Sequence, residues 1–291
     1  MKSRPNQEAD MTQIGIIGLG RMGGAIAQRM QAQGQSVQGW TRSGRAVESI
    51  ATTADLASLV GACDTLILSL LDDAAVASVL DACLQQDLTG KIIIDTSTVV
   101  PTILKDRITQ IESKGALAVD APISGGPELV LAGECGVFIG GSETAAARAQ
   151  STLGAISGRV FHVGPLGTGL VMKTINNSML QCYFSGLHDM MPLAKRAGLP
   201  LETALRILCG GPAGIPMITD RIPKILGDDQ TVGFEIQAAH KDNSVFQRVA
   251  QAYGLNSPVL ALAGERQKQA LADGLGAEDP AALVSAAYDR G

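Results

Sequence analysis

The first half of the chain alternates between short apolar runs and amphipathic stretches, in blocks that fit strands and helices. An apolar run from Thr12 leads into a glycine turn, then a helical stretch ending at Gly34 and a second strand at residues 36–40. Further apolar strands are predicted at 65–71, 91–95, 116–121 and 137–140, with helical stretches between them. This alternation predicts a doubly wound α/β domain with a mostly parallel sheet covered by helices on both faces.

The second half of the chain has a helical period and few β-rich runs. Helices are predicted at 168–196, 202–208, 214–226, 237–253, 257–273 and 280–288. Pro192 lies inside the first of these and is expected to kink or end it. The expected organisation is a disordered extension at 1–11, the α/β domain at 12–165 and an all-α domain at 166–291.

The turn after the first strand has the spacing GxGxxG, formed by Gly18, Gly20 and Gly23. In a strand–turn–helix context, the first glycine permits the tight turn, the second lets the backbone approach a pyrophosphate, and the third lets helix and strand pack closely. The free N–H groups of the helix start then face the phosphates. Dinucleotide binding in a Rossmann domain is therefore predicted, with Arg21 and Met22 included in the site. A glycine turn that binds nothing is the alternative.

The end of the second strand favours NADP over NAD. NAD sites usually carry Asp or Glu there to bind the ribose 2′-hydroxyl, whereas this chain has Thr41, Arg42 and Ser43. The guanidinium of Arg42 suits a 2′-phosphate, to which the hydroxyl of Thr41 or Ser43 can also donate. Arg45 is a second candidate cation. A solvated loop arginine is the alternative interpretation.

A turn near residue 124 and a helix near residue 173 carry further candidates. Ser124, followed by Gly125 and Gly126, is predicted to form a nest for a carboxylate, with a plain tight turn as the alternative. Lys173 and Asn177 are expected to project from one helix face while Ile175 and Met179 are buried. Partial desolvation would lower the pKa of Lys173 and make it a proton donor or acceptor; a solvated helix lysine is the alternative.

Composition narrows the classes of function. The 291 residues are 46% hydrophobic and 18% charged, with a net charge of −5, which argues against a nucleic-acid partner. The five cysteines form no CxxC pair and the three histidines are scattered, so no metal site or disulfide framework is predicted. No apolar run reaches membrane-spanning length and the first ten residues are polar, so a cytoplasmic protein is expected.

Five motifs in order carry a family resemblance: IGIIGLGRMG, DTST, DAPISGG, GTGLVMKTINN and HKDN. From Thr12 to its end, the chain resembles the β-hydroxyacid dehydrogenase family, which includes 3-hydroxyisobutyrate dehydrogenase and semialdehyde reductases. The resemblance implies hydride transfer between NADP and a small β-hydroxyacid or aldehyde-acid, with Lys173 as general acid and base. It also implies that Ser124, Gly125 and Gly126 bind the substrate carboxylate and that Asn177 orients the substrate.

The same resemblance implies the remaining cofactor contacts. Thr98 would lie by the nicotinamide, and Lys241, oriented by Asp242, would close the cofactor site. Leu70 and Leu71 would face the cofactor; many relatives have Leu-Pro there, so a turn of different shape is expected. The Thr-Arg-Ser sequence is similar to that of NADP-preferring members, and relatives suggest a homodimer or homotetramer.

Three alternatives stay open at this point. Imine reductases have the same architecture but usually replace the lysine. A non-catalytic nucleotide-binding module leaves an intact Lys173 unexplained. In the third alternative, Lys173 is structural and Lys241 acts in its place.

Overall fold

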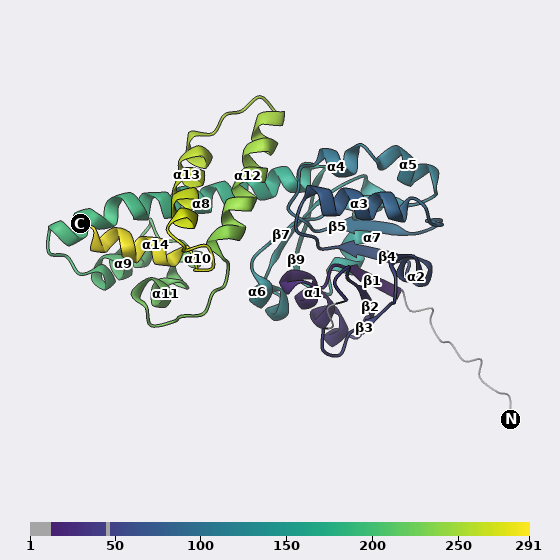
Figure 1. Ribbon diagram of the computed structural model, residues 1–291, viewed down its shortest axis with the longest axis horizontal. Coiled ribbons are helices and arrows are strands. Elements are labelled where there is room, and N and C mark those ends of the chain that lie inside the picture. The colour runs from purple at the N-terminus through teal and green to yellow at the C-terminus, as the bar shows by residue number, and fades with distance from the viewer. Residues whose placement is uncertain (1–12, 45–46) are drawn as a thin grey trace. The chain divides into compact units, whose positions relative to one another are not determined.

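The fold is that of a computed structural model, which describes residues 13–44 and 47–291. The expected extension at 1–11 and the second candidate cation Arg45 fall outside these residues. The chain divides into two compact units, the first ending at Lys173 and the second formed by Thr174–Gly291 (Figure 1). The α/β fold followed by a helical C-terminal domain is confirmed.

The first unit is built around one nine-stranded sheet with the order β3-β2-β1-β4-β5-β6-β8-β7, in which β9 also pairs with β8. All pairings among β1 to β6 are parallel. The strands are β1 (Gln13–Ile17), β2 (Ser36–Trp40), β3 (Ala51–Thr52), β4 (Thr65–Leu68), β5 (Ile92–Asp95), β6 (Leu117–Asp120), β7 (Ile123–Ser124), β8 (Gly136–Gly140) and β9 (Arg159–Gly164).

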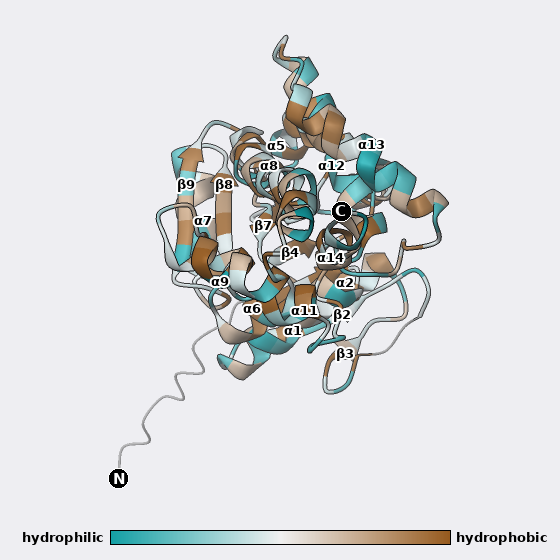
Figure 2. Cartoon of the chain, turned by 90° about the vertical axis from the view of Figure 1, so that its left-hand side faces the viewer, coloured by the Kyte–Doolittle hydropathy of each residue, from teal (hydrophilic) through white to brown (hydrophobic). Residues whose placement is uncertain are grey.

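Two apolar cores lie on the two faces of this sheet. Helices α1 (Arg21–Ala32), α6 (Pro127–Ala132) and α7 (Glu143–Leu153) pack into one core. Helices α2 (Leu56–Ala62), α3 (Asp73–Cys83), α4 (Thr102–Lys105) and α5 (Ile108–Ser113) pack into the other. All five residues of β8 are buried, and Figure 2 shows much of this strand in brown. Burial on both faces explains why the strands are continuous apolar runs.

Three details of the sheet differ from the sequence prediction. The strand predicted at 65–71 ends at Leu68, because Asp72 caps α3 and leaves the residues between as a loop. The strand β8 is antiparallel to β6 and β7, so the sheet is mixed at this end. The strand β9 is not among those predicted, because His162 interrupts its apolar run.

The second unit is all helical. Helix α8 (Thr168–Arg196) begins in the first unit, and the others are α9 (Leu201–Gly210), α10 (Pro216–Thr219), α11 (Ile222–Leu226), α12 (Ile236–Ala252), α13 (Pro258–Ala272) and α14 (Ala281–Asp289). Its core combines apolar residues of α8, α9, α10, α11 and α14. Among the described residues, no helix has the length and apolar character needed to cross a bilayer.

Helix α8 continues through Pro192 to Arg196, so of the two outcomes expected at that residue the helix end is excluded. Two other helix predictions need correction. The predicted stretch 214–226 is two short helices, because Pro216 and Pro223 each occupy a first-turn position. Burial of Ile175 and Met179 was wrong: their side chains are 53% and 61% exposed. The helical period turns them away from the face that holds Lys173.

Candidate active site

Most of the predicted site residues of the first unit follow one row of paired strand residues. Ile17 of β1 pairs with Trp40 of β2 and with Leu68 of β4; the row then continues through Asp95 of β5 to Asp120 of β6. The segments after these residues contain the glycine turn, the Thr-Arg-Ser sequence, the Leu-Leu pair, Thr98 and Ser124. Because the strands are parallel, these segments emerge at one edge of the sheet, which is where ligands bind in open α/β folds.

The glycine turn has the backbone that the GxGxxG spacing requires. Gly18 has φ +97° and donates its N–H to the carbonyl of Trp40 at 2.8 Å. A Cβ on Gly23 would overlap the carbonyl oxygen of Gly18, so no larger residue fits there. A Cβ on Gly20 would meet nothing within 4 Å, and Gly20 is the N-cap of α1 without a capping side chain. Open space at a helix start with no acidic residue in its first turn fits a pyrophosphate.

The other predicted residues around this turn differ in exposure. Arg21 is exposed, whereas Met22 packs against the core under α1. Arg42 is exposed, and the hydroxyl oxygens of Thr41 and Ser43 lie 3.3 Å apart beside it. The end of β2 therefore presents two hydroxyls and a cation.

The Asp-Thr-Ser-Thr segment after β5 ties neighbouring strand ends together. The Asp95 carboxylate accepts the N–H of Ser97 at 3.0 Å, and Thr96 Oγ1 donates to the carbonyl of Leu68 at 2.6 Å. Ser97 Oγ accepts the N–H of Leu70 at 3.0 Å, which fixes the turn after β4. Leu71, the next residue, is 75% exposed.

Lys173 of α8 contacts Thr98, the last residue of this segment. Its Nζ donates to Thr98 Oγ1 at 2.6 Å, and the two residues are only 7% and 8% exposed. Burial of the amine at hydrogen-bond distance from this hydroxyl makes a defined position for a proton. Lys173 is therefore not a solvated helix lysine, which was the alternative interpretation of this stretch.

Asp120, which no sequence argument singled out, holds the start of the helix that carries Lys173. Its Oδ1 accepts the N–H of Gly167 at 2.5 Å and its Oδ2 accepts the N–H of Leu170 at 2.8 Å. Burial raises the pKa of Asp120 to about 6, although these two N–H bonds and the charge of Lys105 act to lower it. One signal was available in the sequence. Gly167 precedes the helix and has no side-chain oxygen, so the acceptor for the first N–H groups of the helix must come from another residue.

The raised pKa of Asp120 predicts how stability depends on pH. The carboxyl titrates near 3.8 when unfolded and at about 6 when folded, so the folded state binds more protons between these values. Its contribution to stability is present below pH 3.8 and is lost as the pH rises through about 6, an effect of order 3 kcal/mol. The free energy of unfolding of wild type and of Asp120→Asn is measured from about pH 4.5 to 7.5. The stability of the variant relative to wild type should rise with pH over this range. A pH-independent difference between the two proteins would contradict this.

The turn predicted to bind a carboxylate has a backbone conformation that favours glycine, but the side-chain carboxylate of Glu128 lies beside it. Ser124 ends β7, Gly125 has φ +126°, and Gly126 is the N-cap of α6. A Cβ on Gly126 would overlap the carboxylate of Glu128, which is an exposed residue. An anionic ligand at this turn has to displace the Glu128 side chain.

The predicted residues of the second unit lie on two helices. On α8, Asn177 Oδ1 accepts from Asn176 Nδ2 at 3.0 Å. On α12, Lys241 Nζ lies 3.2 Å from Asp242 Oδ1, and both residues are partly buried.

Asn243, the last residue of the HKDN motif, is a packing residue. It is 1% exposed, and its amide donates to the carbonyl of Leu260 at 2.9 Å and to Gln181 Oε1. Its Oδ1 accepts from Gln247 Nε2. These bonds join α12 to α13 and α8 inside the second unit.

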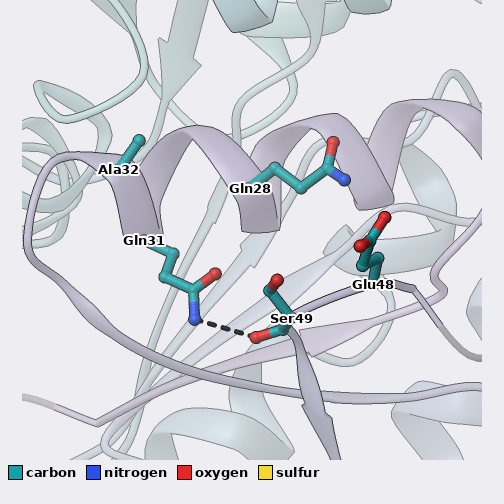
Figure 3. A pocket seen from close by; sticks show the side chains of 5 residues that line it. All are labelled: Gln28, Gln31, Ala32, Glu48 and Ser49. Carbon is teal, nitrogen blue, oxygen red and sulfur yellow. Dashed lines mark hydrogen bonds between the residues drawn. The ribbon is translucent and has the colours of Figure 1, made fainter.

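One hollow of the first unit lies away from this edge. Figure 3 shows it between α1 and the segment before β3, lined by Gln28, Gln31, Ala32, Glu48 and Ser49. Gln31 Nε2 donates across it to the carbonyl of Ser49 at 2.9 Å. None of the predicted site residues lines it, so it carries no argument for the site.

Two family models cover the chain almost end to end. The model for the NAD-binding domain of 6-phosphogluconate dehydrogenase matches residues 13–164. The model described as NAD-binding of NADP-dependent 3-hydroxyisobutyrate dehydrogenase matches residues 167–287. The chain belongs to the 3-hydroxyisobutyrate dehydrogenase family of β-hydroxyacid dehydrogenases. It is thus a nicotinamide-binding oxidoreductase of the hydroxyacid dehydrogenase type, and the family resemblance is confirmed.

Individual members of the 3-hydroxyisobutyrate dehydrogenase family show the same relationship. The chain is 28% identical to 2-(hydroxymethyl)glutarate dehydrogenase of Eubacterium barkeri over 93% of both proteins. It is 30% identical to mitochondrial 3-hydroxyisobutyrate dehydrogenase of Rattus norvegicus over 69% of this chain and 62% of the relative. Mycobacterium tuberculosis 3-hydroxyisobutyrate dehydrogenase, solved with L-serine, has the same fold, with a TM-score of 0.85 at 24% identity over 95% of this chain and 99% of that one.

Proposed function

We propose that this protein is an NADP-dependent oxidoreductase that interconverts a small β-hydroxyacid and the corresponding aldehyde-acid. The observation that carries the proposal is the buried amine of Lys173 held by Thr98 at the edge where the glycine turn also emerges. Oxidising a β-hydroxyacid requires a group that accepts the hydroxyl proton, and reducing the aldehyde requires one that donates it.

Within this proposal, the chain binds the cofactor and moves the proton. NADP, when bound, accepts or supplies the hydride. The glycine turn and the start of α1 would hold its pyrophosphate. Leu70, Leu71 and Thr98 would face the nicotinamide side, and Lys241 would complete the cofactor site. In reduction, Lys173 Nζ donates a proton to the carbonyl oxygen as it gains charge; in oxidation, the neutral amine takes the proton back.

The substrate carboxylate is assigned to Ser124, Gly125 and Gly126, with Asn177 orienting the substrate. The backbone of this turn supports the assignment, since Gly125 has positive φ and Gly126 begins a helix. The carboxylate of Glu128 opposes an anion at the same place, so it is expected to move aside when an acid binds.

The preference for NADP is assigned to Arg42, Thr41 and Ser43. Arg42→Ala is expected to weaken NADPH binding by about tenfold or more and to leave NADH binding nearly unchanged, because only NADPH has a phosphate for the guanidinium. Fluorescence titration with each cofactor measures this. Arg159→Ala removes an exposed cation from β9 as the matched control. Equal losses for both cofactors, or no loss, would contradict the assignment.

The reaction is tested with a panel of short acids. Wild-type protein with NADPH is assayed against glyoxylate, succinic semialdehyde, tartronate semialdehyde and methylmalonate semialdehyde, and in parallel against a cyclic imine. Reduction of one aldehyde-acid is the expected result. Activity on the imine alone would point to an imine reductase, and cofactor binding with no turnover would point to a non-catalytic module.

A homo-oligomer in the cytoplasm completes the proposal. Exposed apolar residues recur at helical spacing along α8, at Ile175, Met179, Met190 and Leu193, each more than half exposed. A stripe of this kind is suited to burial against a second copy in a dimer or tetramer. All five cysteines are free, which suits a reducing compartment.

A further inference from the structure

The helix that carries Lys173 starts without a capping side chain of its own. Gly167 precedes Thr168, the first residue of α8, and the Thr168 hydroxyl donates to the carbonyl of Pro165 at 2.7 Å. The first N–H groups of any helix have no partner inside the helix and need acceptors from elsewhere.

Asp120 supplies those acceptors from a distant part of the chain. Its two carboxylate oxygens take the N–H groups of Gly167 and Leu170, which lie 47 and 50 residues further along the sequence. Asp120 is 1% exposed and lies at the end of β6, inside the sheet. A carboxylate at this position bonds the helix as an N-cap residue does, and its charge is favoured by the helix dipole.

The surrounding residues leave room for this carboxylate. A Cβ on Gly140 of β8 would overlap Asp120 Oδ1, and a Cβ on Gly169 of α8 would lie 2.8 Å from Oδ2. Gly169 also approaches the carbonyl of Phe138 too closely for any side chain. The start of α8 therefore packs backbone to backbone against β8, with Asp120 as the polar link.

Leu170, which donates to the Asp120 carboxylate, and Lys173, which carries the amine, lie about one turn apart on α8. Leu170 is bonded to Asp120 at the end of β6, and Lys173, three residues later, is bonded to Thr98 just beyond the end of β5. The strands β5 and β6 are parallel neighbours, with Asp95 paired to Asp120. The bonds of Leu170 and Lys173 to these two strand ends hold the first turns of α8, within the first unit, against the sheet.

We propose that Asp120 is a positioning residue that sets the start of α8 and thereby holds the amine of Lys173 at Thr98. The charged groups around it are Lys105 of α4, which lies by Gly167, and Asp95 on the neighbouring strand. This inference rests on the proposed function, in which the amine of Lys173 moves the substrate proton.

Two measurements on full-length Asp120→Asn test the proposal. The amide is the same size as the carboxylate but can accept only one of the two N–H bonds well, because its NH₂ group faces a second donor. We expect kcat to fall by about 10- to 100-fold with KM for NADPH changed by less than about threefold, as for a misplaced reacting group. We also expect the Lys173 amine to be labelled faster by trinitrobenzenesulfonate, followed by peptide mass spectrometry.

The matched control is Asp55→Asn, since Asp55 caps α2 by accepting the N–H of Ser58 at 2.7 Å. This control should leave both readouts unchanged. Wild-type kcat and labelling in folded Asp120→Asn would overturn the proposal. Should Asp120→Asn not fold, the same readouts are taken on Asp120→Ala, which removes both acceptor oxygens without adding volume to this close-packed place, and wild-type values there would likewise overturn it. Labelling needs no substrate, so it reports on positioning even where wild type reduces none of the acids, which is a failure of the proposed function alone.

Discussion

Lys173→Met is expected to lower kcat by about 100- to 10,000-fold while NADPH binding is retained, because the substitution removes the proposed proton donor and nearly keeps the volume of the side chain. Methionine suits the site, since Lys173 is buried and an unbranched apolar chain of similar length tolerates that environment. The lost bond from Nζ to Thr98 leaves a hydroxyl that can turn to another acceptor. The dominant effect therefore falls on chemistry rather than on folding.

Steady-state kinetics on the best acid of the panel, together with NADPH titration, measure this effect. Lys91→Met is the matched control, because Lys91 is half-buried in the same unit and its Nζ donates to the carbonyl of Cys63 at 2.8 Å. Lys241→Met is made in parallel and should raise KM for NADPH more than it lowers kcat. Near wild-type turnover in Lys173→Met, with a collapse in Lys241→Met, would transfer the proton-moving role to Lys241.

Gly23→Ala is expected to abolish cofactor binding and to destabilise the first unit. The added Cβ would overlap the carbonyl oxygen of Gly18, a backbone atom that cannot rotate away as a side chain does. Overpacking of this kind costs about 3 kcal/mol or more, and the same strain in the turn would weaken NADPH binding by about 100-fold. Thermal unfolding and NADPH titration together measure both losses.

Gly20→Ala separates the cofactor from the architecture of the turn. Its Cβ would meet nothing within 4 Å, so the melting temperature without cofactor should match that of wild type. The affinity for NADPH should nevertheless fall, because the methyl group would occupy the space that the pyrophosphate approaches. Wild-type affinity in Gly20→Ala would show that no phosphate lies against this residue.

Patterns within short stretches of the sequence were sufficient to predict the fold class and most of its elements. The turn at Gly18, Gly20 and Gly23 was predictable because each glycine meets a steric need within one strand–turn–helix unit. The apolar strands were predictable because both faces of the sheet are covered. The helices of the second unit were predictable from their period, and prolines divide the one stretch that was predicted too long.

Contacts between segments far apart in the sequence could not be predicted from such local patterns. The bonds from Asp120 to Gly167 and Leu170 depend on the pairing of β6 and β8, which no local pattern encodes. For Ile175, apolar character suggested burial, but the side chain is exposed, and the helical period turns it away from the face of Lys173. The short bond of Lys173 to Thr98 likewise joins residues 75 positions apart.

The packing role of Asn243 affects how mutational scans of this protein are interpreted. A library scored by activity in cell lysates would rank Asn243 beside Lys241, because losing either lowers the signal. For Asn243, the loss would come from fewer folded molecules, since its amide joins three helices of the second unit. Normalising activity to the amount of folded protein would separate the two residues: variants at Asn243 would regain their activity per folded molecule, and variants at Lys241 would not.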